Sequence, residues 1–320
     1  MSQSPGIIFY GTPDFAVPSL DALVKEGFRV VGVVTVPDRE AGRGLSLSQS
    51  AVKKYALGQN LPILQPEKLK ALEFLQALED LEPDLQVVVA FRMLPKEVWS
   101  LPRLGTFNLH ASLLPQYRGA APINRAIMNG EHETGVTTFF INEEIDTGAL
   151  LLQEHVTIDP NENAGELHDR LMNIGAGLVV QTIRGILAGN LHPVAQEFQG
   201  PSQATLKPAP KLNKEDLHLN WEREIQEVYN QIRGLTPFPG VWTELRLKNG
   251  SSMNIKIGSA RIADEPLSAS VPPGSCLTDH KRFLKVAARN GYIDILTLQP
   301  ASKKMMKVSE FLNGSGTLLA

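Results

Sequence analysis

The chain has 320 residues, of which 42% are hydrophobic and 20% charged, and its formal net charge is −3. This length suits two domains, and the composition is that of a water-soluble globular protein. A single cysteine, Cys276, excludes an internal disulfide and a cysteine-based zinc cluster. We see neither a secretory signal nor the run of ~20 apolar residues that a membrane helix needs, so we expect a cytoplasmic protein.

Apolar runs and helical patterns alternate over the first ~190 residues. A strand is expected at 7–10, and the helix after it should have Thr12 as its N-cap, Pro13 in its first turn and Gly27 at its end. Further strands are expected at 29–35, 86–90 and 107–110, and helices at 51–59, 71–81 and 164–189. This order predicts a doubly wound, Rossmann-like α/β domain with a mostly parallel sheet and a ligand site at the strands' carboxyl ends.

The second part of the chain has a different pattern. Four prolines lie between Leu191 and Lys211, as in a linker. A helix is expected at 221–233, followed by short strands at 242–248, 253–257, 283–287 and 293–298. These strands predict a small, OB-like β-barrel. We therefore expect a first domain at 1–190, a linker at 191–208 and a β-barrel domain at 209–320.

Charge is divided unevenly between the two parts. Residues 1–206 contain 15 Lys+Arg and 23 Asp+Glu, a net charge of −8, whereas residues 207–320 contain 16 and 11, a net charge of +5. A basic second part favours contact with a polyanion, although solvated surface charges would give the same count.

Several common site types are missing from the sequence. The segment Gly11–Phe15 after the first strand lacks the GxGxxG spacing of a dinucleotide site and the lysine of a phosphate-binding loop. The seven histidines show no HExxH arrangement. Hydride transfer, nucleotide hydrolysis and zinc-dependent hydrolysis are therefore unsupported, and we expect no metal.

Asn108 and His110 are the first candidates for chemistry. Alternation along the strand expected at 107–110 places both side chains on one face, at a strand end. An isolated pair of this kind also occurs as two hydrogen-bonded polar residues without a catalytic role. The segment that follows decides between these interpretations.

Ser112–Pro115, followed by Arg118-Gly119 and Ala121-Pro122, resembles the SLLP…RG…AP signature of the folate-dependent formyltransferases. Asp146, within Ile145-Asp-Thr-Gly148, resembles the third catalytic residue of that family. Members of the family act on glycinamide ribonucleotide, on amino sugars and on methionyl-tRNA, and one branch is a folate hydrolase domain. The resemblance implies that Asn108, His110 and Asp146 are catalytic.

The chemistry of formyl transfer explains these residue types. When an amine attacks the formyl carbon, Asn108 can donate an N–H to the oxygen that becomes negative. His110 can take the proton that the amine loses, because an imidazole titrates near neutral pH. Asp146 would orient that imidazole or hold a water that relays the proton, unless it only caps the turn before Gly148.

The resemblance also implies a co-substrate, 10-formyltetrahydrofolate. Its pterin should lie against the segments that contain Val89, Phe91 and Ile141, and its reactive end against Ser112, Leu113, Leu114 and Pro115. We give Ser112 a role in loop geometry and folate contact, because it lacks the sharp turn of a serine nucleophile.

Within the family, the sequence is most similar to the members that act on methionyl-tRNA. Pro37–Gly44 is similar to their PDRxxGRG loop, which enters the acceptor stem, and Asn220-Trp221 and Pro237–Gly240 are similar to segments of their C-terminal domain. A solvated surface loop is the alternative interpretation of 37–44. The residues that we expect to contact the tRNA are Arg39, Arg43, Lys207, Lys211, Lys303 and Lys304.

Three features depart from the family pattern: Leu45-Ser46 replaces a basic pair, Phe91-Arg92 replaces Tyr-Gly, and Ala111 replaces glycine.

From the similarity to the members that act on methionyl-tRNA, we expect a monomer that formylates initiator methionyl-tRNA for translation initiation. A sugar-nucleotide N-formyltransferase and a catalytically inactive tRNA-binding module are the alternatives. The PDRxxGRG-like loop and the basic second part argue against the first, and the three catalytic residues argue against the second.

Overall fold

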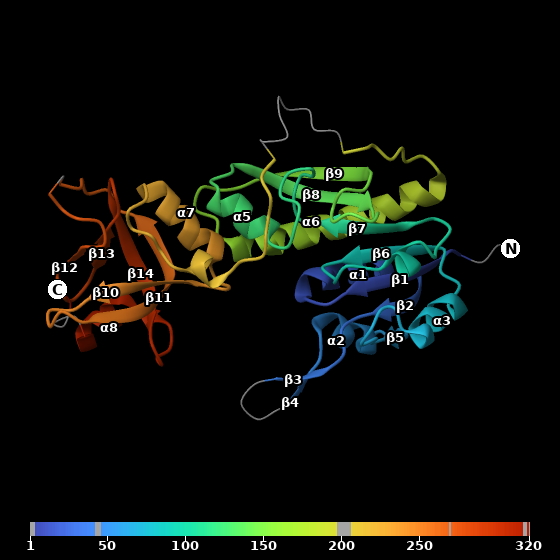
Figure 1. The fold of residues 1–320 in the computed structure, drawn as a ribbon, viewed down its shortest axis with the longest axis horizontal. Helices are drawn as coiled ribbons and strands as arrows, with labels where there is room; N and C mark the ends of the chain where they lie inside the picture. The colour runs from blue at the N-terminus through green and yellow to red at the C-terminus, as the bar shows by residue number, and fades with distance from the viewer. Residues whose placement is uncertain (1–3, 42–45, 197–205, 269, 316–318, 320) are drawn as a thin grey trace. The chain divides into compact units, whose positions relative to one another are not determined.

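The computed structural model describes residues 4–41, 46–196, 206–268, 270–315 and 319 (Figure 1). Contacts group the chain into a first unit, made of 1–119, 134–157 and 168–209, and a second unit, made of 120–133, 158–167 and 210–320. Two short stretches from the first half of the sequence, 120–133 and 158–167, therefore fold with the second unit.

The first unit is built on a seven-stranded sheet. Its strands, in spatial order, are β5 (Ile63–Leu64), β2 (Arg29–Val34), β1 (Gly6–Gly11), β6 (Leu85–Val89), β7 (Thr106–His110), β8 (Glu133–Phe140) and β9 (Leu150–Thr157). Pairing is parallel from β5 to β7 and antiparallel between β7 and β8. Every residue of β1 and β6 is buried, as expected for central strands covered on both faces. The predicted, mostly parallel α/β fold is confirmed.

Helices α1 (Val17–Lys25), α2 (Ala51–Gly58), α3 (Leu72–Asp80) and α4 (Lys96–Trp99) connect these strands. The core on one face of the sheet joins strand residues Ile8 and Val88 to Phe74 and Leu78 of α3. Burying such side chains stabilises the fold by roughly 1.5–3 kcal/mol each.

The predicted start of the first helix is wrong. Asp14–Ala16 form a 3-10 turn, η1, and the α-helix begins at Val17, so Pro13 precedes both with an extended backbone (ψ 177°). Thr12 does not cap the helix; its carbonyl instead accepts a bond from the N–H of Val52 in α2, at 3.5 Å. The predicted end is confirmed, since Gly27 follows the helix with a φ of 73°, which glycine adopts without strain.

Helix α6 (Ala164–Ala188) is long and apolar enough to span a membrane by those two criteria alone. Its side chains show a different role, because Leu171, Val179 and Ile183 are buried within the protein. The hydroxyl of Thr182 also lies 2.8 Å from that of Thr138 on β8. We conclude that α6 is a core helix that packs on the sheet.

A β-hairpin projects from the first unit next to α2 (Figure 1). Its strands are β3 (Arg39–Ala41) and β4 (Ser46–Ser48), with Arg39 paired to Ser48. We expected a loop here rather than strands. Residues 42–45, which include Arg43, lie outside the described residues.

The second unit has an antiparallel sheet in the order β10 (Val241–Arg246), β11 (Ser252–Ile262), β14 (Tyr292–Pro300), β13 (Leu284–Ala287) and β12 (Cys276–Thr278), with β15 (Met306–Lys307) paired to β14. Helices α5 (Pro122–Met128), α7 (Ile225–Leu235) and α8 (Val308–Ser315) belong to the same unit. Val228 and Ile232 of α7 share a core with Ile255 of β11 and Phe311 of α8. The sheet of short strands predicted for the second part of the chain is confirmed, as an antiparallel half-barrel rather than a complete OB-like barrel.

Candidate active site

Strand β7 places two candidate side chains on one face. Asn108 stands opposite Val88 of β6 and Phe139 of β8, and His110 is the last residue of the strand. His110 is only 7% exposed, whereas Asn108 is partly exposed. The carboxamide of Asn108 makes no hydrogen bond to any residue that the structure describes. A half-buried amide without a protein partner is available to a ligand.

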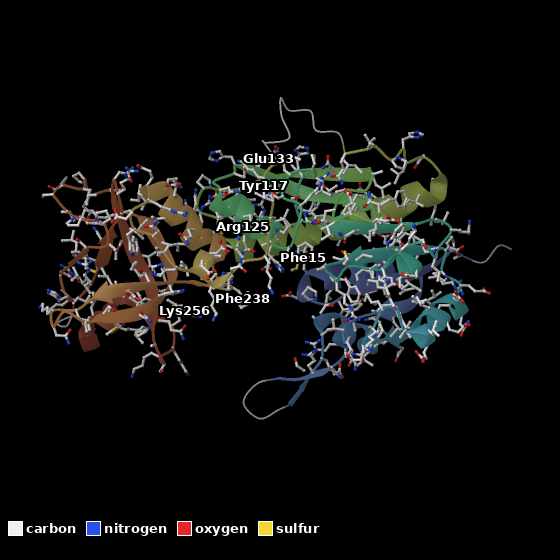
Figure 2. The ribbon with its side chains drawn as sticks, in the orientation of Figure 1. Phe15, Tyr117, Arg125, Glu133, Phe238 and Lys256 are labelled. Carbon is white, nitrogen blue, oxygen red and sulfur yellow. The ribbon has the colours of Figure 1, made fainter. Side chains whose placement is uncertain are left out.

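Both nitrogens of the His110 ring face an acceptor. Nε2 lies 2.9 Å from the carbonyl oxygen of Tyr117. Tyr117, which is labelled in Figure 2, belongs to the loop after β7. Because a carbonyl only accepts, Nε2 must carry a proton there, which leaves the lone pair of the neutral ring on Nδ1. Nδ1 in turn lies 3.7 Å from Oδ2 of Asp146. The ring is therefore oriented with its basic nitrogen toward a carboxylate.

Asp146 comes from the loop between β8 and β9, and its side chain is 14% exposed. Its Oδ2 accepts a hydrogen bond of 2.9 Å from the N–H of Gly119. Within this loop, Oδ1 of Asn142 accepts from the N–H of Glu144 and the hydroxyl of Thr147, and the Thr147 hydroxyl also lies 3.3 Å from the Glu144 carbonyl. The Asp146 carboxylate faces His110, and its negative charge would stabilise a protonated imidazole there.

Gly148 fixes the path of the same loop. A Cβ at this position would overlap the carbonyl oxygen of Phe140, so any larger residue must displace the loop. Gly177 of α6 offers a contrast, because a Cβ there would meet nothing within 4 Å.

We therefore expect Gly148→Ala to lower the free energy of unfolding by about 1–3 kcal/mol, the usual cost of overpacking. Gly177→Ala, which adds the same atom in a helix, should raise it by about 0.5–1 kcal/mol. Urea denaturation of both variants measures the two changes. A Gly148→Ala protein as stable as wild type would show that the loop accommodates a side chain.

The loop after His110 is held by β8. Ser112 is fully buried, and its hydroxyl donates to the carbonyl of Gln116 at 2.7 Å. The hydroxyl of Thr137 donates to the Ser112 carbonyl at 2.6 Å and accepts from the N–H of Leu114 at 3.2 Å. Leu113 packs toward Gly135 of β8. The Ser112 hydroxyl therefore stabilises the loop, while its predicted contact with the folate stays a prediction.

The residues expected to bind the pterin lie together in part. Phe91 and Ile141 both pack against the core cluster that contains Val88 and Leu94, and Val89 is fully buried at the end of β6. Arg92 lies over the ring of Phe91, 5.7 Å from its centroid, and its guanidinium donates to the carbonyls of Pro66 and Glu67.

The residues expected to contact nucleic acid are exposed wherever the structure describes them. They are Arg39 on β3, Lys207 and Lys211 before the second unit's sheet, and Lys303 and Lys304 between β14 and β15. Arg43 lies outside the described residues.

Sequence reasoning missed the backbone groups that complete the site. Tyr117 orients His110 through its carbonyl, and Gly119 holds Asp146 through its N–H. Side-chain patterns carry no trace of such contacts. The one available signal was that Arg118-Gly119 lies within the segment after His110 that resembles the SLLP…RG…AP signature.

Comparisons with known proteins identify the family to which the chain is similar. Residues 6–183 match the family model described as formyl transferase, and residues 211–316 match that of the formyl transferase C-terminal domain. The methionyl-tRNA formyltransferase of Parabacteroides distasonis is 50% identical over 309 residues, which cover 96% of this chain and 95% of that protein. The methionyl-tRNA formyltransferase of Flavobacterium johnsoniae is 51% identical over 308 residues, with coverages of 96% and 95%.

Solved structures share the fold at lower identity. A sugar 3N-formyl transferase has a TM-score of 0.66 and 22% identity, and the match covers 95% of this chain and 100% of that one. An N-formyltransferase from Helicobacter canadensis has a TM-score of 0.63 and 20% identity, with coverages of 90% and 97%. With both family models matched in order and full-length relatives at half identity, the chain belongs to the formyl transferase family.

Proposed function

We propose that this protein transfers a formyl group from 10-formyltetrahydrofolate to the amino group of initiator methionyl-tRNA, for translation initiation in the cytoplasm. The observation that carries the choice of acceptor is the similarity to methionyl-tRNA formyltransferases, at about half identity over nearly the whole length of both chains. The sugar-acting relatives match at 22% identity or less, which supports a common fold only. We further propose that the protein acts as a monomer.

The described residues suit an extended co-substrate that lies along β7. Ile141 is bonded to the first residue of this strand, since its N–H donates to Thr106 at 2.8 Å, and Ser112–Pro115 follow its last residue. The strand between them spans about 13 Å at ~3.3 Å per residue. A pterin against Phe91 and Ile141 would leave the formyl group near the amide of Asn108, which has no hydrogen-bond partner among the described residues.

In the reaction, the amine nitrogen forms a bond to the formyl carbon, and the bond from that carbon to the folate nitrogen breaks. The intermediate carries a negative oxygen, to which Asn108 donates an N–H. The attacking nitrogen loses one proton and the departing folate nitrogen gains one. His110 Nδ1, the ring nitrogen with the lone pair, takes the first proton and supplies the second.

Asp146 supports this proton transfer electrostatically. At 3.7 Å its Oδ2 is too distant from Nδ1 for a direct hydrogen bond. The same distance is too short for a water to lie between the two atoms, so the amine or a relaying water would contact both from the side. Once Nδ1 is protonated, the carboxylate stabilises the imidazolium. Its bond from Gly119 keeps the carboxylate in place through both steps.

The acceptor assay tests the proposed function. Purified protein is incubated with 10-formyltetrahydrofolate and, in parallel, charged initiator tRNA or an amino-sugar nucleotide. We expect formyl transfer to the tRNA alone. Transfer to the sugar alone would establish a sugar N-formyltransferase, and transfer to neither would indicate a tRNA-binding protein without this activity.

The exposed lysines between β14 and β15 give a second prediction. Lys303→Glu combined with Lys304→Glu should raise KM for the tRNA about tenfold and leave kcat and KM for the folate unchanged, because phosphate contacts act without regard to the chemical step. The dependence of log KM on log salt should also weaken by about 2, roughly one per lysine.

The matched control carries the same charge change elsewhere. Lys25 at the end of α1 and Lys70 just before α3 are exposed to 74% and 69%, and neither is among the residues proposed to bind tRNA. Lys25→Glu combined with Lys70→Glu should leave KM for the tRNA within twofold of wild type. Equal effects of the two double variants would assign the change to net charge and remove Lys303 and Lys304 from the binding surface.

A further inference from the structure

Gln196 connects the two loops that bring Asp146 and Gly119 together. Its side-chain Nε2 donates to the carbonyl oxygen of Asp146 at 3.0 Å and to that of Gly148 at 2.7 Å. Its Oε1 accepts from Nε and Nη2 of Arg118, at 3.1 and 2.6 Å. Rotating the amide by half a turn would set its oxygen against two carbonyls and its NH₂ against a guanidinium, so the orientation is fixed.

The bonds of Gln196 act on a loop that needs support from outside. Asp146 has a φ of 54°, in the left-handed region that costs a non-glycine residue conformational energy. At the loop's tip, Asn142, Glu144 and Thr147 bond to one another, and Glu143 pairs with Lys96 of α4. Gln196 instead ties the loop to Arg118, the residue before the one whose N–H holds the carboxylate.

The main chain on either side of Gln196 reinforces this tie. Val194 forms a two-way backbone bridge with Leu150, at 2.7 and 2.9 Å. Further along, the Lys207 carbonyl accepts from the N–H of Tyr117 at 2.7 Å, and the N–H of Ala209 donates to the Arg118 carbonyl at 2.8 Å. The described ends of the segment that we expected to be only a linker therefore contact both loops of the site.

We infer that Gln196 is a positioning residue, which acts through Asp146: it keeps the carboxylate opposite His110 by binding the Asp146 loop to Arg118. The inference rests on the proposed function, because it assigns Asp146 a part in proton transfer. Gln196 need not touch either substrate to affect the rate. A displacement of the carboxylate by about 1 Å can reduce turnover on the order of 10²-fold.

The test variant is Gln196→Glu, which keeps the shape and the acceptor for Arg118 but replaces the donor to the two carbonyls by a carboxylate oxygen. We expect kcat for formyl transfer to fall roughly 10- to 100-fold, with both KM values within twofold of wild type. Gln59→Glu, which changes an exposed residue beyond α2 by the same charge, should leave kcat unchanged.

A double-mutant cycle distinguishes action through Asp146 from a general structural effect. If Gln196 works only by placing this carboxylate, then Gln196→Glu should have little further effect in an Asp146→Ala background. A wild-type kcat for Gln196→Glu, or a loss that multiplies with that of Asp146→Ala, would overturn the inference.

Hydrogen exchange tests the role of Gln196 without measuring formyl transfer, so its outcome does not depend on the proposed function. Amide exchange in peptides that cover 142–148 should accelerate about tenfold in Gln196→Glu and stay unchanged in Gln59→Glu, whatever the acceptor is. If wild-type protein fails to formylate methionyl-tRNA, the proposed function fails, while exchange still reports on the tie. Unchanged exchange at 142–148 would show that the hydrogen bonds of Gln196 do not stabilise the Asp146 loop, and would overturn the inference.

Discussion

His110→Ala should lower kcat by roughly 10²- to 10⁴-fold and leave KM for the folate nearly unchanged. The reason lies in the orientation of the ring. Tyr117 holds the proton on Nε2, so the lone pair on Nδ1 faces Asp146, where an amine proton can be accepted and a protonated ring is stabilised. Alanine removes the only group at this position that both takes up and returns a proton. Steady-state kinetics with each substrate varied in turn measures the separate effects.

The control for this variant is His192→Ala, because His192 is exposed. It should have wild-type kcat. A thermal unfolding curve for His110→Ala checks that the nearly buried position tolerates the smaller side chain. Turnover close to wild type in a folded His110→Ala protein would remove the imidazole from the proton transfer.

The sequence predicted the central strands because burial leaves a strong signal. β1, β2 and β6 are almost continuously apolar, which is the pattern of parallel strands covered on both faces. β8 was missed although it is just as buried. Its Thr137 and Thr138 look like surface residues in the sequence, yet their hydroxyls bond to Ser112 and Thr182. Only the folded chain reveals these partners.

The residues of the candidate site also differ in whether the sequence could predict them. Alternation on one strand was enough to pair Asn108 with His110, because that relation is local. Asp146 lies in a distant loop, and the sequence linked it to them only through the resemblance to a family. Gln196 left no signal, since a lone glutamine in a proline-rich stretch has the composition of a linker. Its bonds to backbone carbonyls depend on tertiary structure alone.

The role of Asn108 can be separated from simple packing by two substitutions. Asn108→Ala should reduce kcat by roughly 10²- to 10³-fold, the usual effect of removing one donor to a developing oxyanion. Both KM values should change little, because the interaction strengthens only as the oxygen becomes negative. Stability should also change little, since the amide makes no hydrogen bond to the residues that the structure describes.

Asn108→Asp is the more informative variant, because it keeps the shape of asparagine while replacing the donor by a carboxylate. If Asn108 only fills space beside His110, aspartate should restore most of the activity that alanine loses. If it donates to the oxyanion, aspartate should be at least as inactive as alanine, since two negative charges would then face each other. Asn313→Ala, at an exposed position of α8, is the control that should keep wild-type kcat. Recovery of activity in Asn108→Asp would therefore show that Asn108 is not the donor to the negative oxygen. A backbone N–H group would then have to be that donor.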